Sequence, residues 1–263
     1  MEFHDAVAIV TGGGRGFGRA FAEKILAGRG KVMLTDVNVH ELQATGKELQ
    51  RQYGEHNVCW DRQNVTEKGS FPRAFGYASK YFKQPVNVLV NNAGIAGDMT
   101  FYEPNSTNWE AVVDIDLTAL IRGTQFAICE FKRTLKGKEG VVVNLGSMAG
   151  LTATPFGPEY AAAKAGVVGF TRSLYQLKKT DNIRCFCLCP GFAETQMGQA
   201  ATVDIPKYTD MMGGLMPVKV VVDAFAAGMQ EPDNAGRVLR IVNQGTAYFR
   251  FPGDKTLFPQ SKL

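Results

Sequence analysis

The sequence predicts an α/β protein: a single domain with a doubly wound parallel sheet flanked by helices. Three observations predict it. Short, continuous apolar runs, of the kind found in buried parallel strands, alternate with segments of helical pattern along the whole chain. Glycines, amides, a carboxylate and a serine stand where several of these runs end. No shift in composition, internal repeat or low-complexity tract interrupts residues 1–263, so we expect one domain.

The chain starts with a strand, a glycine-rich turn and a helix. Residues 6–10 form the apolar run, residues 11–18 contain the glycines, and residues 19–27 have a helical pattern. The backbone N–H groups of such a turn, together with the helix N-terminus, can hold a pyrophosphate. The candidate cofactor-binding residues of this turn are Gly12, Arg15, Gly16, Phe17 and Gly18.

The second strand, residues 31–35, ends at Asp36. A carboxylate at this position can accept hydrogen bonds from both hydroxyls of an adenosine ribose, and it would repel a 2′-phosphate. We therefore expect the cofactor to be NAD rather than NADP. Arg15 argues weakly for NADP, because a cation in the glycine turn can pair with that phosphate. The alternative role for Asp36 is to cap the next helix, residues 39–52.

The middle of the chain continues the alternation. A third strand at residues 58–60, a helix at 67–82 and a fourth strand at 86–90 follow in order. The fourth strand runs into residues 91–94, Asn-Asn-Ala-Gly. Amides there can stabilise the centre of the sheet, and a glycine lets the backbone approach a ligand. Residues 108–135 have the pattern of one long helix.

The stretch after this helix carries the candidate chemistry. Residues 141–145 form a buried strand that ends at Ser147, and a helical pattern begins before Tyr160 and Lys164. Residues i and i+4 share a helix face, so the phenol and the ammonium lie side by side. The ammonium should lower the tyrosine pKa, so that the phenol can exchange a proton with an alcohol or carbonyl, while Ser147 hydrogen-bonds the same oxygen. The alternative is an ordinary surface Tyr–Lys pair.

The last third of the chain contains a sixth strand at residues 183–189, a methionine-rich segment at 192–217 that we expect to form a substrate loop, a strand at 237–242 that closes the sheet, and a C-terminal tail at 249–263. Ligands of such folds bind at the carboxyl ends of the strands. The residues that we expect to meet there are Gly12, Asp36, Asn91, Ser147 and Pro190.

A combination of motifs extends over nearly the whole chain. They are Thr11-Gly12 with Gly16 and Gly18, Asn91-Asn92-Ala93-Gly94, Ser147, Tyr160 with Lys164, and Pro190-Gly191 with Thr195. With them the chain resembles the short-chain dehydrogenase/reductase family. Through residues 18–23, 168–174 and 190–192 it is most similar to the NAD-dependent 15-hydroxyprostaglandin dehydrogenase type.

The resemblance implies a Rossmann-like fold and a role for each matching residue. Tyr160 would be the general acid/base, Lys164 would hold the nicotinamide ribose, and Ser147 would orient the substrate oxygen. Homodimers or homotetramers are implied by the same resemblance. Further cofactor-binding residues that it implies are Asn64, Val65, Asn92, Ala93, Gly94, Tyr160, Lys164, Pro190, Gly191 and Thr195.

Several residues depart from the family pattern. Asp116 stands where the family has an asparagine that supports a proton relay to the lysine, and an ionised Asp116 would hold Lys164 charged; we count it among the catalytic residues. Asn64 replaces an aspartate that binds adenine, although its amide oxygen can still accept that bond. Gly157 stands where prostaglandin dehydrogenases have a glutamine.

The expected activity is NAD-dependent oxidation of a secondary hydroxyl on a lipid-like molecule, such as a hydroxy fatty acid or eicosanoid. The methionines of residues 192–217 suit a flexible apolar chain. Three alternatives remain: an NADPH-dependent carbonyl reductase that uses Arg15, an enoyl reductase, and a cofactor-binding protein without catalysis, which Asp116 would favour.

Composition excludes several classes of protein. The net charge of +4, from 29 basic and 25 acidic residues, is too small to indicate nucleic acid as a partner. No apolar stretch is long enough for a membrane span, and residues 1–5 do not begin a signal peptide. The histidines lack the spacing of metal ligands, so we expect no metal. Cys185, Cys187 and Cys189 alternate along one strand, which indicates core packing in a reducing compartment.

The chain ends in Ser261-Lys262-Leu263. At a free carboxyl terminus this tripeptide is read by a peroxisomal import receptor. We therefore expect the protein to be peroxisomal with that receptor as a partner, and the alternative location is the cytoplasm.

Overall fold

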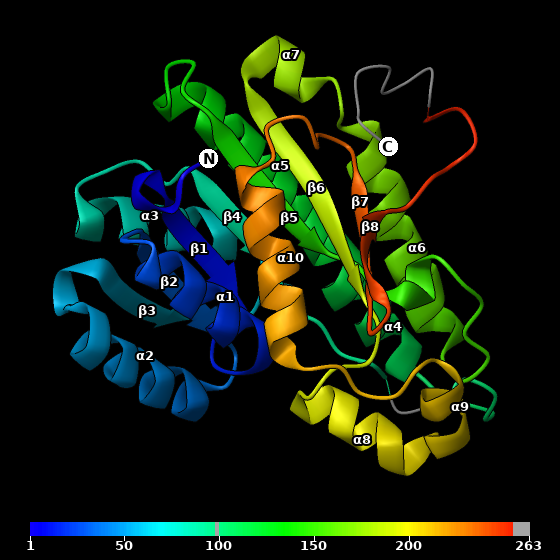
Figure 1. Ribbon diagram of the computed structural model, residues 1–263. Coiled ribbons are helices and arrows are strands. Elements are labelled where there is room, and N and C mark those ends of the chain that lie inside the picture. The colour runs from blue at the N-terminus through cyan, green and yellow to red at the C-terminus, as the bar shows by residue number, and fades with distance from the viewer. Residues whose placement is uncertain (98–99, 255–263) are drawn as a thin grey trace.

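One sheet runs through the protein. The computed structural model describes residues 1–97 and 100–254, and its sheet has the strand order β3-β2-β1-β4-β5-β6-β7-β8 (Figure 1). All neighbouring strands are parallel except β7 and β8. The strands are β1 (Val7–Thr11), β2 (Lys31–Asp36), β3 (Val58–Arg62), β4 (Val88–Asn91), β5 (Gly140–Leu145), β6 (Ile183–Pro190), β7 (Val238–Val242) and β8 (Gly245–Tyr248).

Helices cover both faces of the sheet (Figure 1). One face is covered by α1 (Gly16–Ala27), α2 (Val39–Tyr53) and α10 (Val218–Gln230), and the other by α3 (Ser70–Phe82), α5 (Ala119–Thr134) and α6 (Pro158–Ser173). The shorter helices are Phe3–Asp5, Glu55–Asn57, α4 (Asn108–Val113), Met148–Gly150, α7 (Leu177–Asp181), α8 (Gln196–Asp204) and α9 (Pro206–Met211). The predicted doubly wound fold is confirmed.

Strand β1 explains why the central strands read as continuous apolar runs. All of its residues are buried. Because successive side chains point to opposite faces, Ala8 and Val10 pack with α1, α2 and α10, while Val7 and Ile9 pack with α3 and α5. Strand β6 does the same, and its three cysteines are free thiols in the core, as predicted.

The sheet extends beyond the strand expected to close it. The prediction that residues 237–242 form the edge is wrong, because β8 pairs antiparallel with β7 outside it. Asn243 and Gln244 make the turn, and Gly245 has a φ of +136°. The β8 residues are mostly exposed, so no apolar alternation marks the strand in the sequence.

The long helix expected over residues 108–135 is also corrected. It is interrupted by a π-helical segment, Asp114–Thr118, between α4 and α5. A π turn places one more residue in the turn than an α-helix does, and such turns are frequent at functional sites. Asp116 lies in the middle of this π segment and is fully buried.

The strand order reverses between β1 and β4, which lie side by side although β2 and β3 separate them in the sequence. In doubly wound sheets the crevice beyond the carboxyl ends of such a strand pair is where ligands bind. The glycine turn follows β1 and residues 92–97 follow β4, so both lie at this crevice.

Candidate active site at the carboxyl ends of the strands

Three of the predicted catalytic side chains meet beyond β5. Tyr160 and Lys164 project from α6, and the Lys164 Nζ atom lies 5.4 Å from the centre of the Tyr160 ring. Ser147 follows β5 and caps the short helix after it by accepting a hydrogen bond from the Ala149 N–H group. Its hydroxyl also lies close enough to Tyr160 to lower the pKa of the phenol. The predicted juxtaposition is therefore confirmed, and this pair is not a surface pair.

Asp116 joins this group from the π segment. Its Oδ2 atom lies 3.0 Å from the Lys164 Nζ atom, and both side chains are buried. Its Oδ1 atom accepts a hydrogen bond from the Ile95 N–H group at 2.8 Å. Lys164 also donates to the Leu145 carbonyl at 3.0 Å. The lysine is thus fixed between β5 and the π segment.

The expected fall in the tyrosine pKa is wrong in this structure. Burial raises the pKa of Tyr160 above its ordinary value of 10.0; Lys164 and the Ser147 hydroxyl lower it, whereas the charge of Asp116 raises it further. For Lys164, burial lowers the pKa, but the charges of Asp116 and Tyr160 outweigh burial and the pKa lies above its usual value. The ammonium alone would acidify the phenol, but burial and the carboxylate together reverse the direction of the shift.

A buried polar network holds β4 and β5 beneath the site. The Asn91 side-chain amide donates to the Asn144 side-chain oxygen, Oδ1, at 2.9 Å and to the Thr124 hydroxyl at 3.0 Å. The Asn144 side-chain amide donates to the Thr171 hydroxyl at 2.9 Å. These residues come from two strands and from the two helices packed over them. Sequence reasoning missed Asn144, Thr124 and Thr171. The sequence contained one signal for this network, the side-chain amide of Asn144 inside the apolar run 141–145.

The glycine turn has the shape that a pyrophosphate requires. Gly12 and Gly16 have φ angles of +61° and +54°, which side chains disfavour. A Cβ atom at Gly18 would lie 2.1 Å from the Gly12 carbonyl oxygen, so α1 approaches β1 closely only because that residue is glycine. The Asn92 amide donates to the carbonyls of Thr11 and Gly12 at 2.9 and 3.0 Å. Asn92 therefore holds the turn in place.

Asp36 lies beside this turn as predicted. Its Oδ2 atom accepts from the Gly14 N–H group at 3.0 Å, and its Oδ1 atom accepts from the Asn38 N–H group at 2.9 Å. Asn38, not Asp36, caps α2. The Arg15 guanidinium pairs with Glu41 at 3.0 Å, so the cation considered for NADP already has an anionic partner. Asp36 and Glu41 together fit NAD better than NADP.

The remaining predicted cofactor residues lie around the same crevice. Thr195 caps α8, and its side chain lies 3.8 Å from the position of a Cβ atom on Gly16, so the two residues face each other. Gly191 follows the end of β6 at Pro190, and its N–H group donates to the Ile241 carbonyl at 2.9 Å. Ala93 and Gly94 follow β4, and Gly94 lies against the Asp116 carboxylate.

Three predicted residues have their side chains engaged within the protein. Phe17 packs on Phe21, with ring centres 6.0 Å apart. Val65 is buried in the core on the α3 side. The Asn64 carbonyl oxygen accepts from both the backbone and the hydroxyl of Thr66. The side-chain oxygen expected to bind adenine is therefore already used in the turn.

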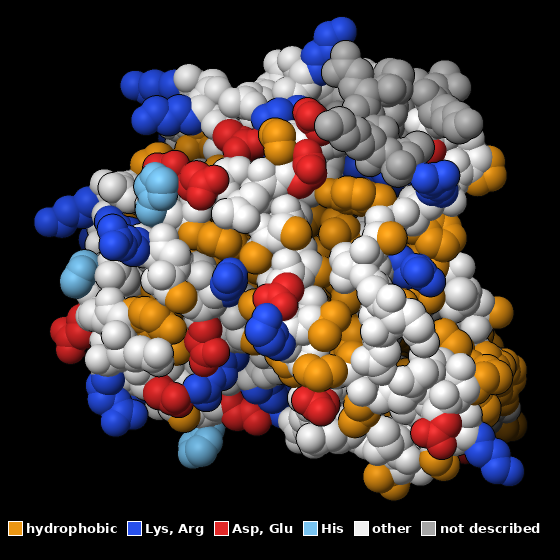
Figure 2. Space-filling model, in the orientation of Figure 1, with side chains coloured by type: hydrophobic (Ala, Val, Ile, Leu, Met, Phe, Trp, Pro, Cys, Tyr) orange, Lys and Arg blue, Asp and Glu red, His pale blue; other side chains and the backbone are white. Residues whose placement is uncertain are grey.

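Residues 192–217, the predicted substrate loop, contain two short helices, α8 and α9. They reach the segment between Ser147 and Tyr160, because the Tyr208 hydroxyl donates to the Ala153 carbonyl at 3.1 Å and its ring contacts Phe156. In Figure 2 hydrophobic side chains are scattered over α8 and α9 among polar and charged ones. The exposed large hydrophobic residues of α8 and α9 are Met197, Val203 and Met211, and Phe156 is exposed in the segment that Tyr208 contacts. Met216 is buried in the core.

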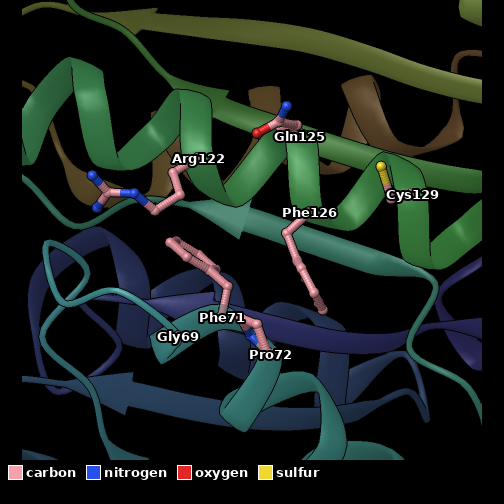
Figure 3. Close-up of a pocket in the computed structure, with 7 residues that line it drawn as sticks. All are labelled: Gly69, Phe71, Pro72, Arg122, Gln125, Phe126 and Cys129. Atoms are coloured by element: carbon pink, nitrogen blue, oxygen red, sulfur yellow. The ribbon is translucent and has the colours of Figure 1, made fainter.

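A separate pocket of about 250 Å³ opens between α3 and α5 (Figure 3). It is lined by Gly69, Phe71, Pro72, Arg122, Gln125, Phe126 and Cys129. None of the predicted site residues lines it. In residues 1–97 and 100–254 we find no helix with the length and apolar character of a membrane span, and these residues contain no cluster of potential metal ligands.

The fold and the residues at the strand ends define a class of oxidoreductases. The family model described as short chain dehydrogenase matches residues 6–205. The chain belongs to the short-chain dehydrogenase family, as its motifs predicted.

Its relatives include the predicted type. The chain is 27% identical to the 15-hydroxyprostaglandin dehydrogenase (NAD(+)) of Bos taurus over 95% of this chain and 96% of that protein. It is 32% identical to the human protein of the same name, over 74% and 71% of the two chains. It is also 32% identical to the 3-oxoacyl-(acyl-carrier-protein) reductase FabG of Aquifex aeolicus, over 81% and 84%.

A solved structure agrees with this assignment. A short chain dehydrogenase/reductase from Burkholderia phymatum in complex with NAD superposes with a TM-score of 0.75, 26% identity and 88% coverage of each chain. The prostaglandin dehydrogenases are named for NAD and the Burkholderia protein was solved with NAD, in agreement with the cofactor predicted from Asp36.

Proposed function

We propose that the protein is an NAD-dependent dehydrogenase that oxidises a secondary hydroxyl of a lipid-like molecule to the ketone. The observation that carries the proposal is the contact of Ser147, Tyr160 and Lys164 at the crevice that also contains the glycine turn and Asp36. The NAD named for the prostaglandin dehydrogenases and for the Burkholderia structure supports the cofactor.

The residues of this chain divide the work as follows. Tyr160, as phenolate, accepts the proton of the substrate hydroxyl, and Ser147 hydrogen-bonds the same oxygen and fixes its position. Lys164 lies beside the phenol and stabilises its negative charge. NAD, when bound, would supply the acceptor for the hydride of the carbinol carbon. The glycine turn and the N-terminus of α1 would hold its pyrophosphate, and Asp36 would hold its adenosine ribose.

The apolar side chains near the site support a lipid-like substrate. Phe156 and Met197 are each more than two-fifths exposed, at 43% and 44%, and Met211 is 71% exposed. Exposed thioethers and aromatic rings offer an adaptable apolar surface to a flexible chain. The names of the relatives support the same class, because prostaglandins and acyl chains are both lipid-like.

The experiment is a comparison of Tyr160→Phe with the unmodified enzyme. Alcohol oxidation is followed by NADH absorbance with a panel of secondary alcohols, including hydroxy fatty acids. We expect turnover to fall by about a thousandfold or more, because removing a positioned acid/base group costs 10²–10⁴ in rate. NAD binding, measured by calorimetry, should be retained. Turnover within tenfold of the unmodified enzyme would refute the role of Tyr160.

Carbonyl reduction with NADPH is the second candidate. The FabG relative favours a ketone as the substrate, but the pairing of Arg15 with Glu41 disfavours a 2′-phosphate. A preference for NADPH over NADH in ketone reduction would support this candidate against the first.

We also propose that the protein is imported into peroxisomes. The supporting tripeptide, Ser261-Lys262-Leu263, lies outside the described residues. Asp254, the last described residue, is held against α6 by a hydrogen bond from Arg172. A fluorescent protein fused to the N-terminus should follow a peroxisomal marker, and deletion of the tripeptide should release it to the cytoplasm. A homodimer or homotetramer remains a prediction, which light scattering can test.

A further inference from the structure

Asp116 is tied to the site more firmly than a residue that only fills space. Its carboxylate spans two segments, because one oxygen accepts from the Ile95 N–H group at 2.8 Å and the other lies 3.0 Å from the Lys164 Nζ atom. Gly94 leaves it room, since a Cβ atom there would lie 3.1 Å from Oδ2. The π segment brings Asp116 into this position with no exposed surface.

The contacts of Lys164 determine which N–H donors of its ammonium remain available to a ligand. An ammonium has three N–H donors. The Leu145 carbonyl accepts from one of them, and the Asp116 Oδ2 atom lies 3.0 Å from Nζ as an ion pair without hydrogen-bond geometry. The ammonium therefore keeps N–H donors for a ligand of the site, and a carboxylate lies beside its positive charge.

The other charged and titratable groups around Tyr160 come from three elements. Lys164 lies on the same helix, Asp116 comes from the π segment, and Cys189 and Cys187 lie beneath on β6. Burial raises the pKa of Cys189 well above its usual range, so this thiol stays neutral. Asp116 is thus the carboxyl group that faces the Tyr160–Lys164 pair; burial raises its pKa above the usual value, and the Lys164 ammonium and the Ile95 N–H group lower it.

We propose that Asp116 is a positioning residue that keeps Lys164 charged and in place and opposes a second negative charge on Tyr160. This inference rests on the proposed function, in which Tyr160 is the base. A buried carboxylate stabilises the ammonium but disfavours a second anion nearby, and the phenolate is that second anion. Alcohol oxidation should therefore require a higher pH than an uncharged residue at position 116 would allow.

The direction of the pH dependence follows from the charges. Burial raises the pKa of Tyr160, Lys164 lowers it and Asp116 raises it. Replacing the carboxylate with an amide of the same shape removes the last of these effects and leaves the other two. The rise of oxidation with pH should then begin at lower pH.

The test compares Asp116→Asn with the unmodified enzyme, and Asp114→Asn is the matched control. Asp114 lies in the same π segment with its side chain partly exposed. For each enzyme, kcat/KM for alcohol oxidation is measured from pH 6 to pH 11. At pH 7 we expect Asp116→Asn to exceed the unmodified enzyme by on the order of threefold to tenfold, since each pKa unit changes the phenolate fraction tenfold. The two should converge at the alkaline end, and Asp114→Asn should follow the unmodified enzyme throughout.

A second measurement needs neither substrate nor cofactor. The ultraviolet absorbance of tyrosinate is titrated in the unmodified protein, in Tyr160→Phe and in Asp116→Asn, and the difference from Tyr160→Phe isolates Tyr160. We expect Tyr160 to ionise at lower pH in Asp116→Asn. If that variant does not fold, Asp116→Ser is titrated in its place; ionisation of Tyr160 at lower pH than in the unmodified protein supports the proposal, and coinciding titration curves overturn it.

The outcomes separate this inference from the proposed function. If Tyr160→Phe is inactive but the pH profiles of Asp116→Asn and the unmodified enzyme coincide, the role of Asp116 is refuted and the proposed function stands. If Tyr160→Phe oxidises alcohols as well as the unmodified enzyme, both are refuted.

Discussion

Replacing Asp36 with alanine tests the choice of cofactor. A carboxylate offers about four acceptor positions, and Asp36 uses two of them for the N–H groups of Gly14 and Asn38. The other two are left for the ribose hydroxyls. These backbone bonds also hold the carboxylate in one orientation before a ligand arrives, so little ordering is required on binding.

The expected loss can be worked from those two positions. A hydrogen bond to a charged acceptor contributes about 1.5–3 kcal/mol, so losing two of them weakens binding by about 3 kcal/mol at the lower limit. That corresponds to about a hundredfold, at 1.4 kcal/mol per tenfold. We expect KM for NAD to rise by about this factor in Asp36→Ala, with a much smaller change in kcat, because the ribose is remote from the reacting carbon.

Glu41 limits how much the use of NADP improves when Asp36 is replaced. Removing Asp36 removes a repulsive charge, but Arg15 remains paired with Glu41. That pair is exposed, with 55% of the Arg15 side chain accessible, and such pairs contribute about 0–1 kcal/mol. Adding Glu41→Gln to Asp36→Ala should therefore improve use of NADP less than tenfold further.

Steady-state kinetics with both cofactors and one alcohol provide the assay, and calorimetry of cofactor binding provides the control for folding and affinity. The reasoning is refuted if Asp36→Ala binds NAD as tightly as the unmodified enzyme. It is also refuted if the unmodified enzyme prefers NADP, because the anions at positions 36 and 41 would then not govern the choice.

Two further predictions concern stability. Gly18→Ala should lower the free energy of unfolding by about 1–3 kcal/mol and weaken NAD binding, because a Cβ atom 2.1 Å from the Gly12 carbonyl oxygen forces α1 away from the turn. At Gly169 a Cβ atom meets nothing within 4 Å, so Gly169→Ala should instead raise the free energy of unfolding by about 0.5–1 kcal/mol. Urea unfolding of both variants checks the contrast. Burial would raise the pKa of Glu139, but Lys178, Arg184 and the N-terminal ammonium outweigh burial and hold this pKa below 4.5. The ionised carboxylate therefore stabilises the fold above that pH. Glu139→Gln should have a lower free energy of unfolding than the unmodified protein at pH 7, and the two free energies should converge as the pH falls.

The layout of the sheet was predictable because the strands that form it are buried on both sides. Such strands leave continuous apolar runs, and their carboxyl ends are marked by residues that cannot continue the run, such as Asp36 and Pro190. Strand β8 left no such mark, because it lies at the edge and its side chains face solvent. The π segment could not be predicted for another reason. Its residues have the composition and spacing of an ordinary helix, so nothing in the sequence marks the additional residue in the turn.

The candidate site was predictable in its members but not in its electrostatics. Spacing places Tyr160 and Lys164 on one helix face, and that alone suggests an ammonium that acidifies a phenol. Such an expectation holds for a pair surrounded by water. In the folded chain both groups lie against β5 and β6, where burial disfavours the phenolate, and Asp116 arrives from a segment 44 positions upstream of Tyr160 to compensate the ammonium. The sign of the shift is therefore set by which chain segments the fold brings together. For that reason burial of the phenol, with the charge of Asp116 adding to it, opposes the phenolate that the spacing of Tyr160 and Lys164 favours.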